Sequence, residues 1–127
     1  MILGIGADIV EIERIEIAIK RHGVRFARRI LTDVEYTIFT AHYQPGHFLA
    51  KRFAAKEAVV KALGTGFHQG ITWHAIEVNN NKFGRPVVEL KAAALTAYNT
   101  MGASNIHLSL SDEKAYALAF VVISRSS

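Results

Sequence analysis

The sequence contains no cysteine, and this absence excludes several classes of protein. Without thiols the chain cannot form a disulfide scaffold, a thiolate zinc site or a cysteine nucleophile. No run of about 20 apolar residues occurs either, so a membrane-spanning helix is not predicted. The opening residues MILGIGADIV lack a basic leader, which argues against a signal peptide. We therefore expect an intracellular, cytoplasmic protein without a membrane partner.

The 127 residues are about the size of one compact domain, and we predict a single domain over 1–127. Half of the residues are hydrophobic, which is typical of a folded chain. The net charge is +4, and basic residues concentrate between Arg14 and Arg29 and between Lys51 and Lys61. A basic balance of this kind favours an acidic partner, such as nucleic acid, a phosphorylated small molecule or an acidic protein.

Hydrophobic periodicity and turn residues predict an α+β fold in which helices pack on an antiparallel sheet. The expected elements are a strand over 1–10, helices within 12–30, a helix opened by 32–35, a helix over 49–63, strands over 71–78 and 86–90, a helix over 91–101, and strands over 105–111 and 115–123. Gly23 predicts a break within the first helical stretch, and Pro45-Gly46 a break before the long helix. Thr32 and Glu35 have the spacing of a capping box.

The first strand has an unusual face. Gly4, Gly6 and Asp8 share one side of it, because side chains alternate along a strand. Two glycines and a carboxylate give little to pack against, so this face leaves room for another backbone or a ligand.

The stretch FAAKEAVVKALGTG, residues 53–66, carries charges close to the apolar stripe of a helix. Lys56 falls almost in the middle of the stripe, and Glu57 lies on its edge with Lys61 one turn later. The simplest interpretation is a solvated Glu57–Lys61 pair of about 0.3–0.5 kcal/mol. Alternatively, Glu57 is a metal ligand and Lys61 binds phosphate.

A metal site of this kind needs a second carboxylate, and Asp8 is the best candidate. Mg²⁺ takes one or two carboxylates and completes its shell with water and phosphate oxygens. The following glycines, Gly64 and Gly66, suit either a left-handed helix cap or a phosphate-binding turn. His107 lies on the polar face of its strand, where a histidine is more often structural than catalytic. His42 and His47 have no third ligand at a spacing typical of zinc sites, so a zinc site is not predicted.

Two stretches together resemble one family. GIGADIVEIERI at 4–15 and FAAKEAVVKALGTG at 53–66 are similar to the two signatures of the holo-acyl-carrier-protein synthases, the short bacterial 4′-phosphopantetheinyl transferases. The resemblance continues through LTDVE, the G-x-P turn at 84–86 and the closing IHLSLSDEKAYALAFVV.

The resemblance implies transfer of 4′-phosphopantetheine from coenzyme A to a serine of apo acyl carrier protein, with release of adenosine 3′,5′-bisphosphate. It further implies a 4′-phosphopantetheinyl transferase fold, a homotrimer with sites between protomers, and Mg²⁺, with Mn²⁺ as an alternative. The implied residues are Asp8 and Glu57 for metal, these two and Lys61 for catalysis, Arg52, Lys61, Gly64, Gly66, Arg85, Pro86 and His107 for coenzyme A, and Arg14, Arg21, Arg25 and Arg28 for the carrier.

One position departs from the family pattern. Many relatives have HxSxSH near the C-terminus, whereas this chain has HLSLSD, which places Asp112 at the second histidine. The general base also stays open, since Asp8 or Glu57 could receive the proton through a water.

Three other functions are compatible with parts of the sequence. Clustered arginines suit a small basic nucleic-acid-binding module, although without an aromatic stacking pattern charge alone gives non-specific affinity. The Asp8–Glu57 pair would also serve a metal-dependent nucleotide-phosphate hydrolase. An inactive protein that keeps the fold is disfavoured by the intact Asp8, Glu57 and Lys61.

Overall fold

The computed structural model describes all residues, 1–127, and has an α+β architecture. Its elements are β1 (Ile2–Glu11), α1 (Ile12–His22), α2 (Val24–Ile30), α3 (Asp33–Ala41), α4 (Pro45–Leu63), a 3₁₀ turn η1 (Trp73–Ala75), β2 (Ile76–Asn80), β3 (Pro86–Leu90), α5 (Ala92–Thr100), β4 (Asn105–Asp112) and β5 (Tyr116–Ser124). The predicted fold class is confirmed.

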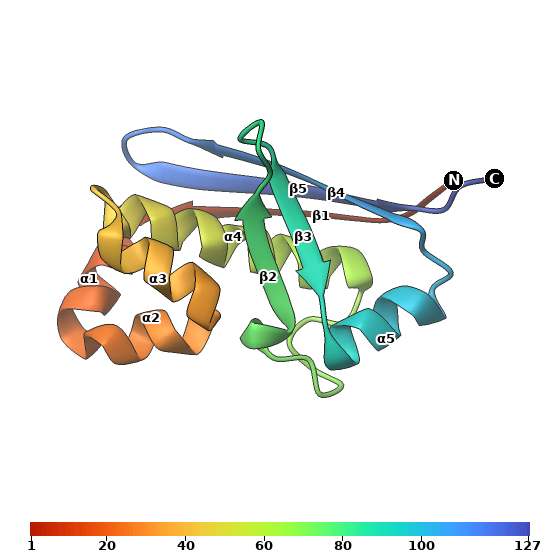
Figure 1. Cartoon of the computed structure of the whole chain (residues 1–127), viewed down its shortest axis with the longest axis horizontal. Coiled ribbons are helices and arrows are strands. Elements are labelled where there is room, and N and C mark those ends of the chain that lie inside the picture. The colour runs from red at the N-terminus through yellow and green to blue at the C-terminus, as the bar shows by residue number, and fades with distance from the viewer.

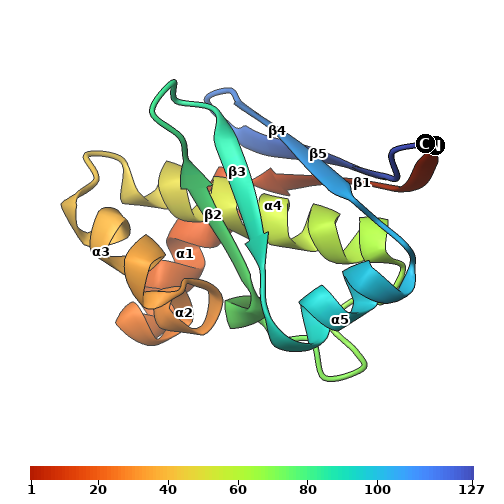
Figure 2. The same ribbon diagram turned by 45° about the vertical axis from the view of Figure 1, so that its right-hand side comes forward.

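Two antiparallel sheets enclose the long helix α4. One sheet has the strand order β1-β5-β4, and the other is the hairpin β2-β3. Figure 1 shows α4 between them, with the larger sheet along one side and the hairpin across the other. The second view shows α1, α2 and α3 gathered at one end of α4 and α5 at the other (Figure 2).

Helix α4 is buried on most of its circumference, as a central helix should be. Its core residues include Leu49, Ala54, Ala58 and Val59, each without solvent exposure. No helix of the chain, α4 included, combines the length and hydropathy needed to cross a bilayer.

Strand β1 lies unusually close to α4. A Cβ atom at Gly6 would collide with the carbonyl oxygen of Ala58, and one at Gly4 with that of Ala62. Only glycine tolerates so close an approach of helix backbone to strand. The glycine face therefore accommodates another backbone, which confirms one of its two predicted uses.

The predicted helix boundaries around the first basic stretch are confirmed. Gly23 has a φ of 62° and separates α1 from α2. At the start of α3, the N–H of Glu35 donates to Thr32 Oγ1 at 3.3 Å, and the N–H of Thr32 donates to Glu35 Oε1 at 2.9 Å. Both halves of the capping box are present.

Two predicted boundaries are wrong. Pro45 begins α4 instead of preceding it, because proline at the first helical position loses no hydrogen bond. The strand predicted from Ile71 starts only at Ile76. Part of this stretch forms the turn η1, in which Trp73 stacks on Phe53 at 5.1 Å and on Phe67 at 4.0 Å between ring centroids. Aromatic stacking of the partly buried indole therefore explains this hydrophobic run better than a strand does.

Candidate active site

Three of the predicted site residues meet where β1 crosses α4. Lys61 Nζ lies 3.1 Å from Asp8 Oδ1 and donates a second bond to the carbonyl oxygen of Ala7 at 2.9 Å. The ammonium therefore pairs with Asp8 on the strand instead of with Glu57 on its own helix. The side chain of Lys61 is 51% exposed and that of Asp8 17%, so a ligand in solution can reach both.

Glu57 belongs to the same cluster. Its pKa is raised above the ordinary value, first by burial and then by the negative charge of Asp8, while Lys61 opposes the shift. The two carboxylates are close enough for the charge of Asp8 to disfavour ionisation of Glu57, although Lys61, which pairs with Asp8, acts in the opposite direction. A divalent cation between them would remove their mutual repulsion.

The backbone explains why Asp8 is at this place. It follows Gly6 by two residues and so projects from the same face of β1, toward α4. Because β1 is an edge strand, this face is open at its side instead of being covered by a further strand. Close glycine–alanine packing thus carries Asp8 to the helix turn that holds Glu57 and Lys61.

The donor set suits a hard cation that draws most of its shell from elsewhere. No three His, Asp or Glu side chains are grouped to hold a metal ion. Asp8 and Glu57 provide oxygen ligands only, and Mg²⁺ characteristically takes one or two carboxylates and fills its other positions with water and phosphate oxygens. The residues present fit Mg²⁺ in the company of a phosphate-bearing substrate.

The glycines after Lys61 terminate the helix. Gly64 has a φ of 77°, and the N–H groups of Gly64, Thr65 and Gly66 all donate to carbonyls in the last turn of α4. These donors are thus engaged in the cap, so the helix-cap interpretation is supported. Because Gly64 and Gly66 have no side chains, they leave space for a ligand beside Lys61. Their contact with coenzyme A stays a prediction.

The remaining residues predicted to bind coenzyme A lie apart from this cluster. Arg52 is nine residues before Lys61 and therefore on the opposite side of α4. Arg85 is exposed beside Pro86, the first residue of β3. His107 is exposed on the outer face of the larger sheet, opposite Val122 of β5. The single chain does not gather these side chains around Asp8.

Arg52 has an unusual environment for an arginine. It is only 4% exposed, its guanidinium lies 4.5 Å from the ring centre of Phe48, and its Nε has no hydrogen-bond partner. Burial lowers its pKa, and the charge of Glu35 opposes that shift. Arg52 lines a hollow between α3, α4 and β2 together with His42 and Lys51. A buried, incompletely satisfied cation beside two further basic groups suits an anion.

The predicted carrier-binding arginines form an exposed basic surface on α1 and α2, which we call the basic surface. It consists of Arg14, Arg21, Arg25 and Arg28. Arg25 also lines a hollow with Phe26 and Arg29. Exposed cations around a partly buried aromatic ring suit an acidic protein partner.

Asp112, where the chain departs from the family pattern, has a structural role. Its carboxylate lies 3.3 Å from His47 Nδ1 and 3.7 Å from Lys51 Nζ, and so connects the end of β4 to the first half of α4. Asp112 and Asp8 lie on different strands with β5 between them, and the pairs that Asp112 makes do not include Asp8.

Sequence analysis missed the partner of Lys56. The buried ammonium pairs with Glu35 at 2.7 Å, and both side chains are fully buried. The available signal was the lysine in the middle of an apolar stripe, because a buried cation requires a counter-charge. Glu35 had been assigned to the capping box alone.

Comparison with known proteins identifies the family. Residues 4–121 match the model of the 4′-phosphopantetheinyl transferase superfamily. A holo-[acyl-carrier-protein] synthase of Vibrio cholerae is 53% identical over 125 residues, which cover 98% of this chain and 99% of that protein. One from Shewanella baltica is 49% identical over 122 residues, covering 96% of each chain.

Solved structures agree with the sequence relatives. The holo-[acyl-carrier-protein] synthase of Neisseria meningitidis superimposes with a TM-score of 0.91 at 42% identity, covering 98% of this chain and all of that chain. The enzyme of Bacillus anthracis, in complex with CoA (3′,5′-ADP), gives a TM-score of 0.83 at 37% identity, covering 99% of each chain. The chain therefore belongs to the holo-[acyl-carrier-protein] synthases of the 4′-phosphopantetheinyl transferase superfamily.

Proposed function

We propose that this protein transfers 4′-phosphopantetheine from coenzyme A to a serine of apo acyl carrier protein, in a Mg²⁺-dependent reaction that releases adenosine 3′,5′-bisphosphate. The observation that carries the proposal is the open cluster of Asp8, Glu57 and Lys61 at the edge of β1. Relatives that cover nearly the whole chain are named for this synthase activity.

Asp8 and Glu57 would hold the metal. Mg²⁺, when bound, supplies positive charge that polarises the diphosphate of the substrate and stabilises the departing bisphosphate. Mn²⁺ is an alternative with the same preference for oxygen ligands.

Lys61 contributes charge from a defined position. Its ammonium is held by Asp8 and by the Ala7 carbonyl, so it is oriented before substrate arrives. A preorientated cation beside the phosphates stabilises the negative charge that develops during transfer. The nucleophile is the serine of the carrier, so the chain needs none of its own. Asp8 and Glu57 are the candidates to receive the serine proton through a water.

The basic surface is the proposed docking site for the carrier. Its four arginines lie on α1 and α2, and α1 follows directly after β1, the strand of Asp8. Complementary charge raises the association rate and orients the partner. Docking at this surface would present the carrier serine near the end of β1 that adjoins α1, where Asp8 lies.

We further propose a homotrimer with sites between protomers. The outer face of the sheet β1-β5-β4 carries exposed apolar side chains, namely Ile5, Ile9, Tyr116, Leu118 and Phe120. An exposed patch of this kind indicates a protein–protein interface. Contact between copies would also supply His107 from the same face to a neighbour's phosphate site. The cytoplasmic location stays a prediction.

The test is intact-mass analysis of apo acyl carrier protein after incubation with this protein, coenzyme A and Mg²⁺. A carrier heavier by one phosphopantetheine, and unmodified when chelator is present, supports the transferase and its metal. Release of inorganic phosphate from coenzyme A without carrier would instead favour the hydrolase. Binding to DNA or RNA that is lost steeply as salt is raised would instead favour a small basic module that binds nucleic acid without specificity.

A further inference from the structure

Lys56 is a fully buried cation whose three N–H donors are all used. Nζ lies 2.7 Å from Glu35 Oε1, 2.6 Å from the carbonyl oxygen of Ile30 and 3.2 Å from that of Trp73. These acceptors belong to α3, to the last residue of α2 and to η1. One side chain of α4 therefore joins three elements that are distant in sequence.

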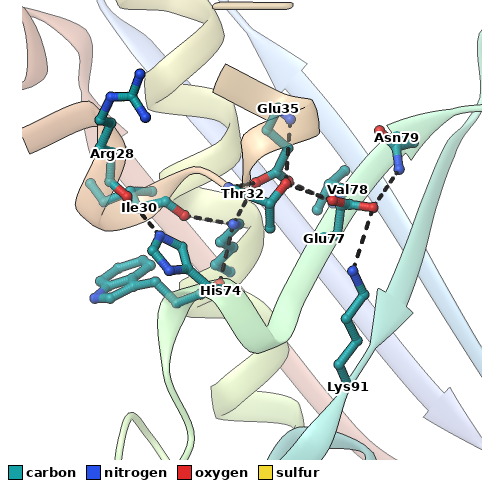
Figure 3. Close-up of polar contacts among 11 residues, drawn as sticks. Arg28, Ile30, Thr32, Glu35, His74, Glu77, Val78, Asn79 and Lys91 are labelled. Atoms are coloured by element: carbon teal, nitrogen blue, oxygen red, sulfur yellow. Dashed lines mark hydrogen bonds and ion pairs between the residues drawn. The ribbon is translucent and has the colours of Figure 1, made fainter. Parts of the chain in front are cut away.

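Glu35 is equally engaged on its side. Oε1 accepts from Lys56 and from the N–H of Thr32, and Oε2 accepts from the N–H of Val78 at 2.7 Å. Thr32 in turn donates its hydroxyl to Glu77 of β2 at 2.6 Å. Figure 3 shows this chain of contacts running from the end of α2 to β2 and onward to Lys91. The carboxylate thus closes a network around the start of α3.

The end of α2 is anchored twice by this network. His74 of η1 donates from Nε2 to the carbonyl oxygen of Arg28 at 2.6 Å, two residues before the carbonyl of Ile30 that Lys56 holds. Helix α2 has only seven residues and carries Arg25 and Arg28 of the basic surface. Directional hydrogen bonds therefore attach the end of α2 to both α4 and η1, in addition to apolar contact.

Stability alone is a poor explanation for such a network. A buried ion pair gains little over a well-packed apolar pair, because desolvation offsets the attraction. Burial lowers the pKa of Lys56, while the charge of Glu35 acts against that shift. What the pair provides instead is a defined geometry, because the three acceptors must lie at fixed positions around Nζ for all three hydrogen bonds to form.

We propose that Lys56 is a positioning residue for the transfer. Its hydrogen bonds fix the junction between α2 and α3, which we call the corner, relative to α4. One end of the basic surface is thereby kept at a constant distance from Glu57 and Lys61. This inference rests on the proposed function, because it assumes that carrier docks on the basic surface. Glu57 follows Lys56 directly in α4, so both partners of the reaction are placed from one helix turn.

The experiment compares a double variant, Lys56→Met with Glu35→Gln, with wild type and with a matched control. The double variant removes both charges, and the amide oxygen introduced at residue 35 still accepts from one of the two backbone N–H groups. Lys114→Met is the control, because Lys114 is an exposed lysine in the turn between β4 and β5, outside the buried network and the proposed binding residues. Carrier kinetics, coenzyme A affinity and melting temperature are measured for all three.

We expect kcat/KM for the carrier to fall about tenfold to a hundredfold in the double variant, the size of effect that a misplacement near 1 Å causes. The dissociation constant for coenzyme A should stay within about twofold of wild type, a difference well under 1.4 kcal/mol. The control should match wild type in both. Unchanged carrier kinetics in a folded double variant would overturn the proposal, as would equal losses for carrier and coenzyme A.

Hydrogen exchange of the wild-type protein provides a measurement that needs neither a variant nor activity. If Lys56 holds the corner, the amides of residues 26–36 exchange as slowly as those in the middle of α4. Fast exchange there would overturn the proposal even if the double variant failed to fold. A wild-type protein that leaves carrier unmodified but protects these amides would refute the proposed function and not the anchoring itself.

Discussion

Helix α4 carries two lysines, Lys56 and Lys61, whose environments differ in burial and in the number of hydrogen-bond partners. Lys56 is fully buried, and each of its donors meets an acceptor of the chain. Lys61, about one and a half turns later, is half exposed, pairs with Asp8 and also acts on the pKa of Glu57. A closed network leaves no position for a ligand, whereas the open cluster does. The difference separates a structural cluster of charges from a candidate active site.

The largest expected effect concerns the open cluster. Glu57→Gln or Asp8→Asn should lower transfer by at least about a hundredfold, because each removes a carboxylate ligand of the proposed metal site. The fold should persist, and Glu57→Gln should leave the melting temperature unchanged or raise it. A raised pKa means that ionisation of Glu57 costs stability, which is lost as pH rises through that pKa. Near-normal activity of either variant at limiting Mg²⁺ would refute the metal assignment.

The second effect concerns stability, for which we expect the buried Lys56 to matter more than the exposed Lys61. Lys56→Met should destabilise the protein by about 3–5 kcal/mol, because it leaves Glu35 as a buried, unpaired charge. Lys61→Met should cost at most about 1 kcal/mol, since that pair is exposed to solvent. Urea unfolding of the two variants measures both values. Equal losses would mean that the two lysines do not differ as the structure indicates.

Charge reversal on the basic surface should have a smaller and more selective effect. Arg14→Glu or Arg21→Glu should raise KM for the carrier about tenfold through lost electrostatic complementarity, and KM for coenzyme A much less. Steady-state kinetics with each substrate varied in turn provides the measurement. If both KM values rise together, the carrier docks elsewhere.

The smallest effect is a shift in pH dependence. Burial and the charge of Asp8 raise the pKa of Glu57, so protons compete with the metal for this carboxylate more strongly than usual. As the pH is lowered, metal binding should therefore begin to weaken at a higher pH than it would with a glutamate of ordinary pKa. Asp8→Asn removes one cause, so the pKa of Glu57 should move down toward its usual value. NMR titration of the Glu57 carboxyl in both proteins would show this. A pKa unaffected by Asp8→Asn would mean that the two carboxylates do not interact.

Local sequence signals predicted much of the fold and the central part of the candidate site. The capping box at Thr32, the break at Gly23 and the strand alternation around Asp8 all depend on neighbours within a few residues. The glycine face of β1 also indicated room for another backbone or a ligand, and the backbone of α4 occupies it. Such features are visible in sequence because short-range geometry determines them.

Long-range pairings were not predictable in the same way. Nothing near Lys56 in the chain indicates Glu35 as its partner, because 21 residues separate them and Glu35 already had a local role. Likewise, Lys61 had a neighbour at helical spacing in Glu57, but the fold gives it Asp8, 53 residues away. The predicted start of β2 at Ile71 was wrong because stacking of Trp73 outweighs a local preference for extended backbone.

The central claim is that Asp8 and Glu57 form the metal site while the Lys56–Glu35 network does not bind ligands. The most direct test is titration of Mn²⁺ followed by its EPR signal, in the presence of coenzyme A. We predict that the wild-type protein binds Mn²⁺, that Lys114→Met binds it equally, and that Asp8→Asn and Glu57→Gln lose this binding. Undiminished Mn²⁺ binding by both carboxylate variants, shown to be folded, would contradict the account.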